Sequence, residues 1–302
     1  MTQLISKLQY KKSEKGEFDQ IAPRNLQDTL KLIQEYPWAT ERSLASVELT
    51  CPSVTIEHPT GTYLKLGHYF SGKFCLYYLD SRKKVYFKVA PTLQEASEWI
   101  RDFFENDGHI EGFEKYSFTW KGAAHFITNT FEYVVDKTAR FRFFSVIFWT
   151  YNFVIMLVLI RWLEEGQTPT LISVLGVLFI YMCFCGPHLY FYLDYLKIDR
   201  YRYLRISRAA EIFTLGTAGE QRQYSKKDIE SIKFFGNFNS RSLWQDCNVY
   251  LMTFKNGDEI RFTSLLIRRG DFSKKFPDHE IKTVIVNFPT VQSAELSKTA
   301  SV

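Results

Sequence analysis

Hydrophobic and polar positions follow different patterns in different parts of this chain. Between residues 46 and 90 they alternate with period two in short segments, and the same alternation returns after residue 200. Between these parts lie two runs, residues 143–160 and 171–193, that contain no Asp, Glu, Lys or Arg. Alternation predicts β-strands with one buried face, whereas an uncharged run of about 18 residues or more is long enough for a helix to cross a membrane.

The two apolar runs favour a transmembrane helical hairpin over residues 141–193. The first run, FFSVIFWTYNFVIMLVLI, and the second, LISVLGVLFIYMCFCGPHLYFYL, are joined by the short polar link RWLEEGQTPT. Either run alone could be the core helix of a soluble domain, but soluble core helices are seldom this long without a charge. Aromatic residues at the ends of both runs are typical of membrane–water interfaces. We therefore expect two membrane spans.

Basic residues flank the hairpin on its two outer sides, whereas the link holds Arg161 beside Glu164 and Glu165. This distribution predicts that both termini are cytoplasmic. The opening MTQLISKLQYKKSEKGEF lacks the apolar core of a signal peptide. The 5 cysteines show no CxxC spacing and no disulfide framework, which agrees with a reducing compartment. The flanking cations are Lys137, Arg140 and Arg142 before the first run, and Lys197, Arg200, Arg202, Arg205 and Arg208 after the second.

His188 is the polar candidate inside the membrane, because it follows Gly186 and Pro187 within the second apolar run. An ionisable residue at membrane depth is a functional hypothesis by default. It lies five residues from the end of the run, however, which is roughly 7–8 Å along a helix and within reach of the interface. Pro187 also frees backbone carbonyls that a neighbouring side chain could satisfy. We favour a structural role for His188.

The N-terminal part is predicted to be an α+β module at residues 23–107, after a polar segment at 1–22. NLQDTLKLIQEY has the spacing of a short amphipathic helix. SVELT, SVTIE, TYLKLG, KFCLYYL and KVYFKV predict four or five short antiparallel strands. TLQEASEWIRDFFE then begins with a capping box of Thr92 and Glu95, which predicts a helix packed on the sheet. Residues 108–140 are an aromatic linker that we expect to form a further helix into the membrane.

Aromatic side chains on the predicted N-terminal sheet are candidates for a surface that binds a protein partner. Aromatic residues make up 17% of the whole chain, which is high for a plain soluble domain. The candidate surface residues are Tyr63, Tyr69, Phe70, Tyr77 and Tyr86.

The C-terminal part, residues 194–290, is predicted to be an all-β domain. YRYLRIS, EIFTLG, QRQYS, IESIKFF, NVYLMTF and EIRFTSL are six short strands, and IKTVIVNFPTV is a seventh strand or a short helix. So many short antiparallel strands predict a small barrel or sandwich. In KNGDE, Asn256 and Gly257 are the preferred pair for a type I′ hairpin turn. Residues 291–302 are expected to be a disordered tail.

The sequence holds no recognisable catalytic or metal-binding motif. It lacks a glycine-rich phosphate loop, HExxH and GxSxG. Its six histidines are scattered and show no metal-ligand spacing with one another. We therefore expect no catalytic residue, no metal and no cofactor. A net charge of +5 is too small for the dense basic field of a nucleic-acid-binding protein, so nucleic acid is not an expected partner.

The stretch YLKIDRYRYLRISR, residues 195–208, places five cations directly after the second span. Each cation near an anionic leaflet contributes about 1 kcal/mol of attraction. These charges either set the topology alone or bind anionic lipid headgroups as well, and we weigh the two interpretations equally. The candidate headgroup residues are Lys197, Arg200, Arg202, Arg205 and Arg208.

The C-terminal part resembles bacterial PH-like domains that follow a two-helix membrane hairpin. The resemblance rests on LKIDRYRYLRIS, YSKKDIESIKFF and VYLMTFKNGDEIRFTSLLI, over residues 194–267. It implies binding or scaffolding rather than catalysis. The sequence departs from a standard PH fold after Ile267, where a long helix is expected, because RRGDFSKKFPDHEIKTVIVNFP holds Pro277 and β-branched residues.

The N-terminal part is similar to small α+β proteins of gut Bacteroidetes, some of them encoded beside interbacterial toxins. The two resemblances together imply a multi-pass protein of the inner (cytoplasmic) membrane with its soluble parts in the cytoplasm. The primary hypothesis is a non-enzymatic binding protein with a protein partner, in one version an immunity protein against a toxin that acts at the membrane. The alternatives are a PH-like sensor of lipid or envelope state or a scaffold, and a weaker one is an enzyme with an unrecognised site.

Overall fold

The computed structural model describes residues 2–42, 49–116, 122–164, 166, 170–217, 219–237 and 244–293. It divides into two compact units. Residues 1–130 with 207–209 form the first unit, and residues 131–206 with 210–302 form the second. The architecture is α+β, with antiparallel sheets in both units.

The first unit is built on a 7-stranded sheet in the order β2-β1-β3-β4-β5-β6-β7, all of whose neighbours are antiparallel. Its strands are β1 (Leu4–Gln9), β2 (Asp19–Arg24), β3 (Ser53–Glu57), β4 (Tyr63–His68), β5 (Phe74–Leu79), β6 (Val85–Ala90) and β7 (Glu114–Lys115). Its helices are α1 (Leu26–Glu35), α2 (Trp38–Arg42), η1 (Phe70–Gly72), α3 (Leu93–Glu105) and η2 (Gly122–His125).

The predicted strands from SVTIE to KVYFKV are confirmed as β3 to β6, and the first predicted strand, SVELT, lies mostly outside the described residues. The prediction of a polar segment at residues 1–22 is wrong, because β1 and β2 belong to the sheet. Leu4 and Leu8 of β1 are buried in the core. The charged Lys7 made this segment look polar in the sequence. Its side chain is buried and donates a hydrogen bond to Glu57 at 2.9 Å.

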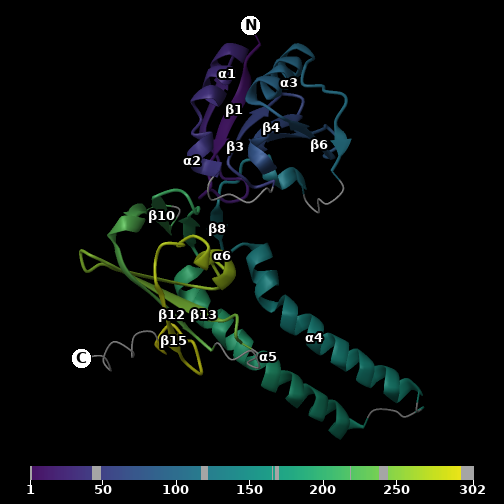
Figure 1. The fold of residues 1–302 in the computed structure, drawn as a ribbon. Coiled ribbons are helices and arrows are strands. Elements are labelled where there is room, and N and C mark those ends of the chain that lie inside the picture. The colour runs from purple at the N-terminus through teal and green to yellow at the C-terminus, as the bar shows by residue number, and fades with distance from the viewer. Residues whose placement is uncertain are drawn as a thin grey trace. The chain divides into compact units, whose positions relative to one another are not determined.

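One face of this sheet is covered by α1 and α3 (Figure 1). Each helix begins with a side-chain cap, and the cap of α3 is the predicted Thr92. Asn25 accepts a hydrogen bond from the Asp28 amide at 2.9 Å, and Thr92 accepts one from the Glu95 amide at 3.2 Å. Ile33 of α1 and Phe103 of α3 are fully buried against the strands, which confirms the predicted amphipathic packing.

The opposite face carries a second apolar cluster, covered in part by the segment that follows η2. Phe126 of this segment is fully buried and packs with Tyr63 and Tyr77 of the sheet. Lys65 is buried beside Phe126 and donates hydrogen bonds to Gln9 at 2.7 Å and to the His125 carbonyl at 3.3 Å. Burial lowers the pKa of Lys65 to about 8. Both faces of the sheet are therefore packed.

The second unit contains two 4-stranded sheets, in the orders β11-β10-β9-β8 and β14-β13-β12-β15. Its strands are β8 (Glu132–Val134), β9 (Arg202–Arg205), β10 (Ile212–Thr217), β11 (Gln221–Ser225), β12 (Ile229–Gly236), β13 (Asn248–Phe254), β14 (Glu259–Thr263) and β15 (Ile281–Ile285). Its helices are α4 (Lys137–Glu164), α5 (Leu171–Asp199), η3 (Lys226–Asp228) and α6 (Arg269–Ser273).

The predicted C-terminal strands are confirmed, and the seventh is β15, which pairs in parallel with β12. The two sheets enclose one core, and the barrel is not closed. The hairpin between β13 and β14 lies at Asn256 and Gly257 as predicted, but the prediction of a type I′ turn is wrong. Of these two residues only Gly257 has a positive φ, at 86°, and the Phe254 amide donates to the Asp258 carbonyl. This is a three-residue hairpin with a left-handed glycine at its end.

The strand β8 lies before the two long helices in the sequence and pairs with β9, which lies after them. In this antiparallel ladder Glu132 lies opposite Arg205, and Val134 lies opposite Tyr203. The prediction that residues 108–140 form a linker helix is therefore wrong, because this stretch supplies β7 to one sheet and β8 to the other. Three residues are too short a run for the period-two pattern to show. The helix α4 begins directly after β8, where Asp136 accepts a hydrogen bond from the Ala139 amide at 2.6 Å.

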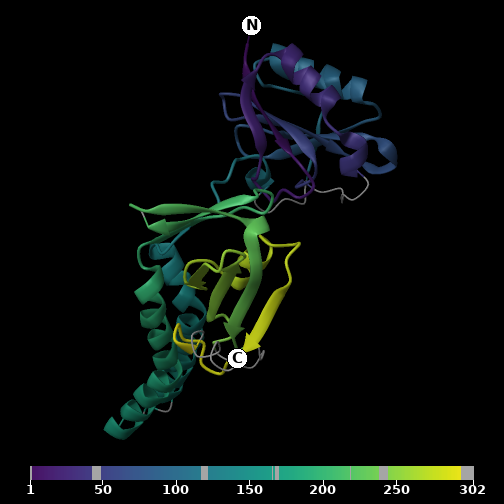
Figure 2. The same cartoon turned by 90° about the vertical axis from the view of Figure 1, so that its left-hand side faces the viewer.

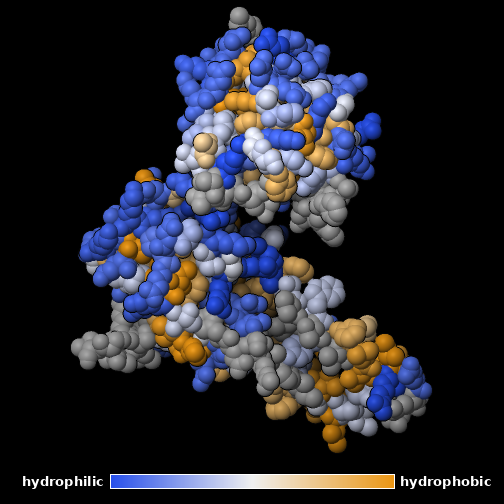
Figure 3. All heavy atoms as spheres, in the orientation of Figure 1, coloured by the Kyte–Doolittle hydropathy of each residue, from blue (hydrophilic) through white to orange (hydrophobic). Residues whose placement is uncertain are grey.

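Two long helices, α4 and α5, run side by side away from the sheets (Figures 1 and 2). Among the described residues, α5 is the helix that is long and apolar enough to cross a membrane. Little of its apolar stretch is buried within the protein, and Ile172 and Phe179 are 82% and 70% exposed. The far part of the helix pair shows a largely hydrophobic surface (Figure 3).

The long C-terminal helix of a standard PH fold is absent from residues 268–293, where α6 spans 5 residues. Phe191 and Tyr195 of α5 are instead fully buried in the core of the two sheets, and the Tyr195 hydroxyl donates to the Pro289 carbonyl at 2.7 Å. Asp199 at the end of α5 accepts hydrogen bonds from the Thr263 amide and hydroxyl of β14 at 2.8 and 2.6 Å.

The Asp199 carboxyl makes the stability of the second unit depend on pH. Burial raises its pKa from 3.8 to about 7, and the Thr263 hydrogen bonds and Arg202 offset only part of this shift. Between these two values the folded protein binds more protons than the unfolded chain, so its stability falls as the pH rises from about 4 to about 7. Replacing Asp199 with Asn removes this carboxyl group and therefore its contribution to the pH dependence of stability.

We predict that the wild-type protein loses about 2–3 kcal/mol of stability relative to Asp199→Asn between pH 5 and pH 8. The measurement is reversible chemical unfolding of the purified protein in detergent, followed by circular dichroism. The exposed Asp278→Asn variant is the matched control, and it should track the wild type. A constant difference between wild type and Asp199→Asn across this pH range would contradict the account.

Candidate functional site

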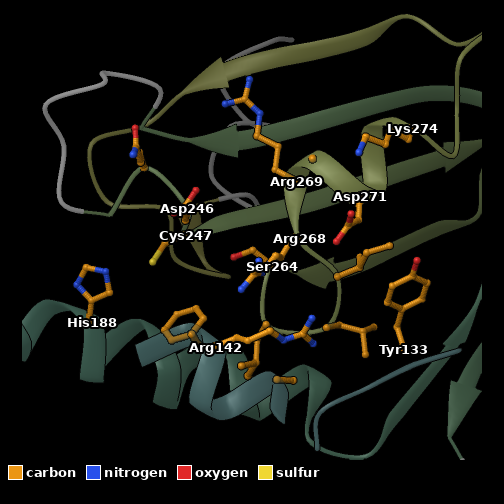
Figure 4. Close-up of a pocket in the computed structure, with 17 residues that line it drawn as sticks. Tyr133, Arg142, His188, Asp246, Cys247, Ser264, Arg268, Arg269, Asp271 and Lys274 are labelled. Carbon is orange, nitrogen blue, oxygen red and sulfur yellow. The ribbon is translucent and has the colours of Figure 1, made fainter. Parts of the chain in front are cut away.

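A cavity of about 410 Å³ lies within the second unit, between the first turns of α4, the second half of α5 and the loops at one end of the β12–β13–β14 sheet (Figure 4). The helices contribute Arg142 and Phe143 from α4 and His188 from α5. The loops contribute residues 245–247 before β13 and residues 264–274, which run from the end of β14 through α6. The pairing of β8 with β9 brings both helices to this position.

The charge of the cavity wall is predominantly positive. Asp246 and Asp271 also line it, but neither forms an ion pair with the described part of the chain. The Arg142 side chain reaches from α4 toward the loop that carries Ser264 and Arg268, whereas Arg269 extends away from α4 (Figure 4). The lining cations are Arg142, Arg268, Arg269 and Lys274.

Two of these cations form no ion pair with the residues that the structure describes. Arg268 and Lys274 are exposed, and their side chains form no ion pair or hydrogen bond with the residues that the structure describes. Arg142 donates a 3.3 Å hydrogen bond to the Thr138 carbonyl of its own helix, which leaves its charge uncompensated. The wall of the cavity therefore attracts anions.

The cysteine and the histidine of the cavity are packed rather than poised for chemistry. Cys247 is 2% exposed, and burial raises the pKa of its thiol, so the thiolate is not populated near neutral pH. His188 is 4% exposed and lies against the rings of Phe143 and Phe191, at centroid distances of 6.3 and 6.5 Å. The structural role of His188 stays a prediction.

The candidate headgroup residues at the end of α5 and after it differ in their surroundings. Lys197 forms an ion pair with Asp194 at 3.1 Å, and the Arg202 guanidinium lies 3.7 Å from the buried Asp199. Arg200 is exposed and lies over the Tyr201 ring, and Arg205 is exposed on β9. Arg208 is assigned to the first unit. Two of the five predicted cations thus have carboxylate partners, and their headgroup role stays a prediction.

The prediction that the N-terminal module presents five exposed aromatic residues is wrong for most of them. Tyr63 and Tyr77 are 6% and 2% exposed, because the segment after η2 covers their face of the sheet. Tyr86 and Tyr69 are half-buried against the two apolar clusters of that unit. Phe70 in η1 is 64% exposed and is the member of this set that a partner could reach directly.

The described residues contain no group of three or more His, Cys, Asp or Glu side chains that could hold a metal ion. The basic cavity itself is absent from the sequence predictions, which used Arg142 only to assign topology. The available signal was RRGDFSKK, residues 268–275, with four cations in eight positions. Its last member, Lys275, is buried over the rings of Phe131 and Tyr133.

Comparison with known proteins supports the PH-like assignment of this unit. A protein-family model described as a PH domain matches residues 132–275. The matched range begins at β8, contains both long helices and ends directly after α6, so it starts well before the resemblance at residues 194–267. Searches of the curated proteins and of the solved structures found no match. The match supports a PH-like second unit in which α4 and α5 lie between the first two strands, β8 and β9.

Substitutions of two aromatic residues separate a core role from a surface role in the first unit. We predict that Tyr77→Ala lowers the free energy of unfolding by about 3–5 kcal/mol, because it opens a cavity in a packed face. Phe70→Ala should change it by less than about 0.5 kcal/mol, because Phe70 is exposed. The measurement is chemical unfolding of both variants. Equally small changes in the free energy of unfolding would contradict the burial of Tyr77 and favour the predicted aromatic surface.

Proposed function

We propose that this chain is a non-enzymatic binding protein anchored in the inner membrane by α4 and α5. The observation that carries the proposal is the uncovered apolar surface of these helices beyond the point where they leave the PH-like sheets. A helix of 28 residues such as α4 is roughly 42 Å long, which exceeds the hydrocarbon thickness of about 30 Å. The hydrophobic effect disfavours leaving so much contiguous apolar surface in water.

The topology of the proposal follows from the strand pairing and from the distribution of charge. The pairing of β8 with β9 holds the first residue of α4 and the last residue of α5 at the same sheet, so in this proposal both helices enter the membrane from one side. The cations Lys137, Arg140 and Arg142 at this end, together with those near the end of α5, support a cytoplasmic location for it. The link between the helices then lies on the outer side.

The anchoring proposal predicts which positions a membrane-impermeant maleimide can reach in intact cells with a permeable outer envelope. Glu164→Cys at the far end of α4 should be labelled before lysis, whereas the exposed Lys282→Cys on β15 should be labelled only after lysis. The wild-type protein gives the background, because Cys51, Cys75 and Cys247 are buried, whereas Cys183 and Cys185 lie in the apolar run 171–193 of the proposed span. Recovery of the unmodified protein in the soluble fraction, or the reverse labelling pattern, would contradict the proposal.

A protein partner is part of the proposal, and an immunity role against a membrane-active toxin is its most specific version. The exposed Phe70 and the neighbouring Tyr69, whose rings lie 5.2 Å apart, offer an aromatic contact of the kind enriched in interfaces. The family match does not extend to residues 1–131, so the support for this version is the N-terminal sequence resemblance.

The immunity version predicts that deleting the gene lowers survival beside a competitor strain that carries the cognate toxin. Expression of the wild-type chain should restore survival, and Phe70→Asp should fail to restore it although the variant accumulates to the same level. The chemically similar change Tyr116→Asp is unsuitable as a control because Tyr116 packs in the core cluster, so the exposed Lys282→Asp on β15 serves instead. Unchanged survival on deletion removes the immunity version.

The sensor alternative places anionic lipid rather than a protein at the centre of the function. Its sequence support lay in the cations of residues 195–208, and two of these are paired with carboxylates. The basic cavity, which opens beside the start of the apolar run, supports a lipid role better than those residues do. This observation keeps the sensor as the second candidate function.

A further inference from the structure

We propose that the cavity between α4, α5 and the α6 loop binds the phosphate group of an anionic molecule, with Arg142, Arg268 and Lys274 as the ligating residues. The proposal adds a site and a ligand class to the anchored PH-like domain. The choice of a lipid as the source of the phosphate rests on the proposed function. The cavity itself does not depend on it.

The ligating residues come from two structural elements that face one another across the cavity. Arg142 extends from the second turn of α4, and Arg268 lies on the opposite wall, in the loop between β14 and α6 (Figure 4). Lys274 follows α6 directly and lines the same cavity. An anion placed between these walls would be contacted from both sides, which a single surface patch of cations does not offer.

The charge balance of the cavity favours a phosphate over a neutral or cationic ligand. Four cations line it against the two carboxylates of Asp246 and Asp271. Because Arg268 and Lys274 make no ion pair with the described residues, binding an anion breaks no existing contact of theirs. Guanidinium groups donate in a planar fork that matches phosphate oxygens, and hydrogen bonds between charged partners are about twice as strong as neutral ones.

The size and lining of the cavity accommodate more than a bare phosphate ion. Its volume of about 410 Å³ lies within the range of small-molecule sites. The polar side chain of Gln245 lines it, and the space around Gly270 is open, since a Cβ added there would meet no atom of the described residues within 4 Å. This leaves room for a glycerol or similar polar group. Phe143, the first residue of the apolar run 143–160, also lines the cavity.

The position of the cavity along the helices favours a lipid as the source of the phosphate. Arg142 directly precedes the uncharged run 143–160, and His188 lies within the run 171–193 on the neighbouring helix. In the proposed topology this level is the membrane–water interface, where the phosphate groups of the cytoplasmic leaflet lie. Soluble phosphate compounds share the same recognition chemistry, so the test must separate the two sources.

The test is a calorimetric titration of the full-length protein in neutral detergent with three probes. Dioctanoyl phosphatidylglycerol supplies a lipid phosphate, sn-glycerol 3-phosphate supplies a soluble one, and dioctanoyl phosphatidylcholine is the zwitterionic control with the same acyl chains. The test variant is Arg268→Gln with Lys274→Gln. The matched control is Lys255→Gln with Lys282→Gln, which removes the same charge from exposed positions outside the cavity.

We expect saturable binding of the anionic lipid to the wild-type protein and no comparable binding of phosphatidylcholine. The test variant should bind the anionic lipid at least about tenfold more weakly, the loss expected for one charge-assisted hydrogen bond, and the control pair should bind it as the wild type does. Binding of glycerol 3-phosphate as tight as that of the lipid, with the same dependence on Arg268 and Lys274, supports the site with a soluble source instead. Equal losses in both double variants, or no binding of either anionic probe, would overturn the proposal.

The titration and the maleimide experiment test the phosphate site and the membrane anchor separately, so either proposal can be contradicted without the other. The titration is made in detergent and reports on the cavity alone, whereas labelling in cells reports on the anchor alone. Thermal unfolding of both double variants confirms that they fold, because all four substituted side chains are exposed and their removal should leave stability within about 0.5 kcal/mol.

Discussion

The pairing of β8 with β9 is the interaction on which the second unit depends. It joins three residues before the long helices to a strand after them, and so closes a loop of more than sixty residues with one short ladder. Without it, α4 would be held to the sheets only by side-chain packing, such as that of Phe143 against the core. With it, the two helices leave the fold as a pair from adjacent strands, and the cavity forms where they leave. The placement of Arg142 opposite Arg268 is a consequence of this pairing.

The end of α5 supplies the second constraint, because it belongs to the helical pair and to the PH-like core at once. Phe191 and Tyr195 are fully buried among residues of both sheets, and Asp199 is tied to Thr263 of β14. Shifting this helix along its axis would remove buried aromatic groups from the core and break the Asp199 hydrogen bonds. A force or ligand that acts on the exposed part of α5 is therefore transmitted to the sheet by packing, because a close-packed core does not deform gradually.

Several features were predictable from the sequence because they depend on local patterns. The strands β3 to β6 and β9 to β14 follow from period-two alternation, and the caps Asn25 and Thr92 follow from residue type and spacing. The strands β1 and β8 were not predictable in this way. In β1 the interior position of Lys7 breaks the apolar pattern, and its burial is compensated by Glu57, a residue fifty positions away. The strand β8 is too short to show period-two alternation, and its partner β9 lies after the two helices in the sequence.

The candidate site shows the same division. Runs of uncharged residues and flanking cations predicted an anchor and its direction, because both are properties of contiguous sequence. The predicted aromatic surface was largely wrong, because alternation along a strand indicates two faces but not whether a second layer covers the outer one. The cavity was missed because Arg142 and Arg268 are 126 positions apart and meet only when β8 pairs with β9.

Disulfide formation between facing positions of β8 and β9 tests this account most directly. Val134 and Tyr203 lie opposite each other in the ladder, and facing residues of antiparallel strands have Cα atoms about 4.5–5.5 Å apart, within the range of a disulfide. The double variant Val134→Cys and Tyr203→Cys, oxidised in isolated membranes, should yield an intramolecular disulfide between these two positions in the mass spectrum of its peptides. The pair Tyr133→Cys and Tyr203→Cys, displaced by one residue and pointing to opposite faces, should yield none. Absence of the first disulfide, or equal formation of both, would contradict the strand pairing on which the anchor and the cavity depend.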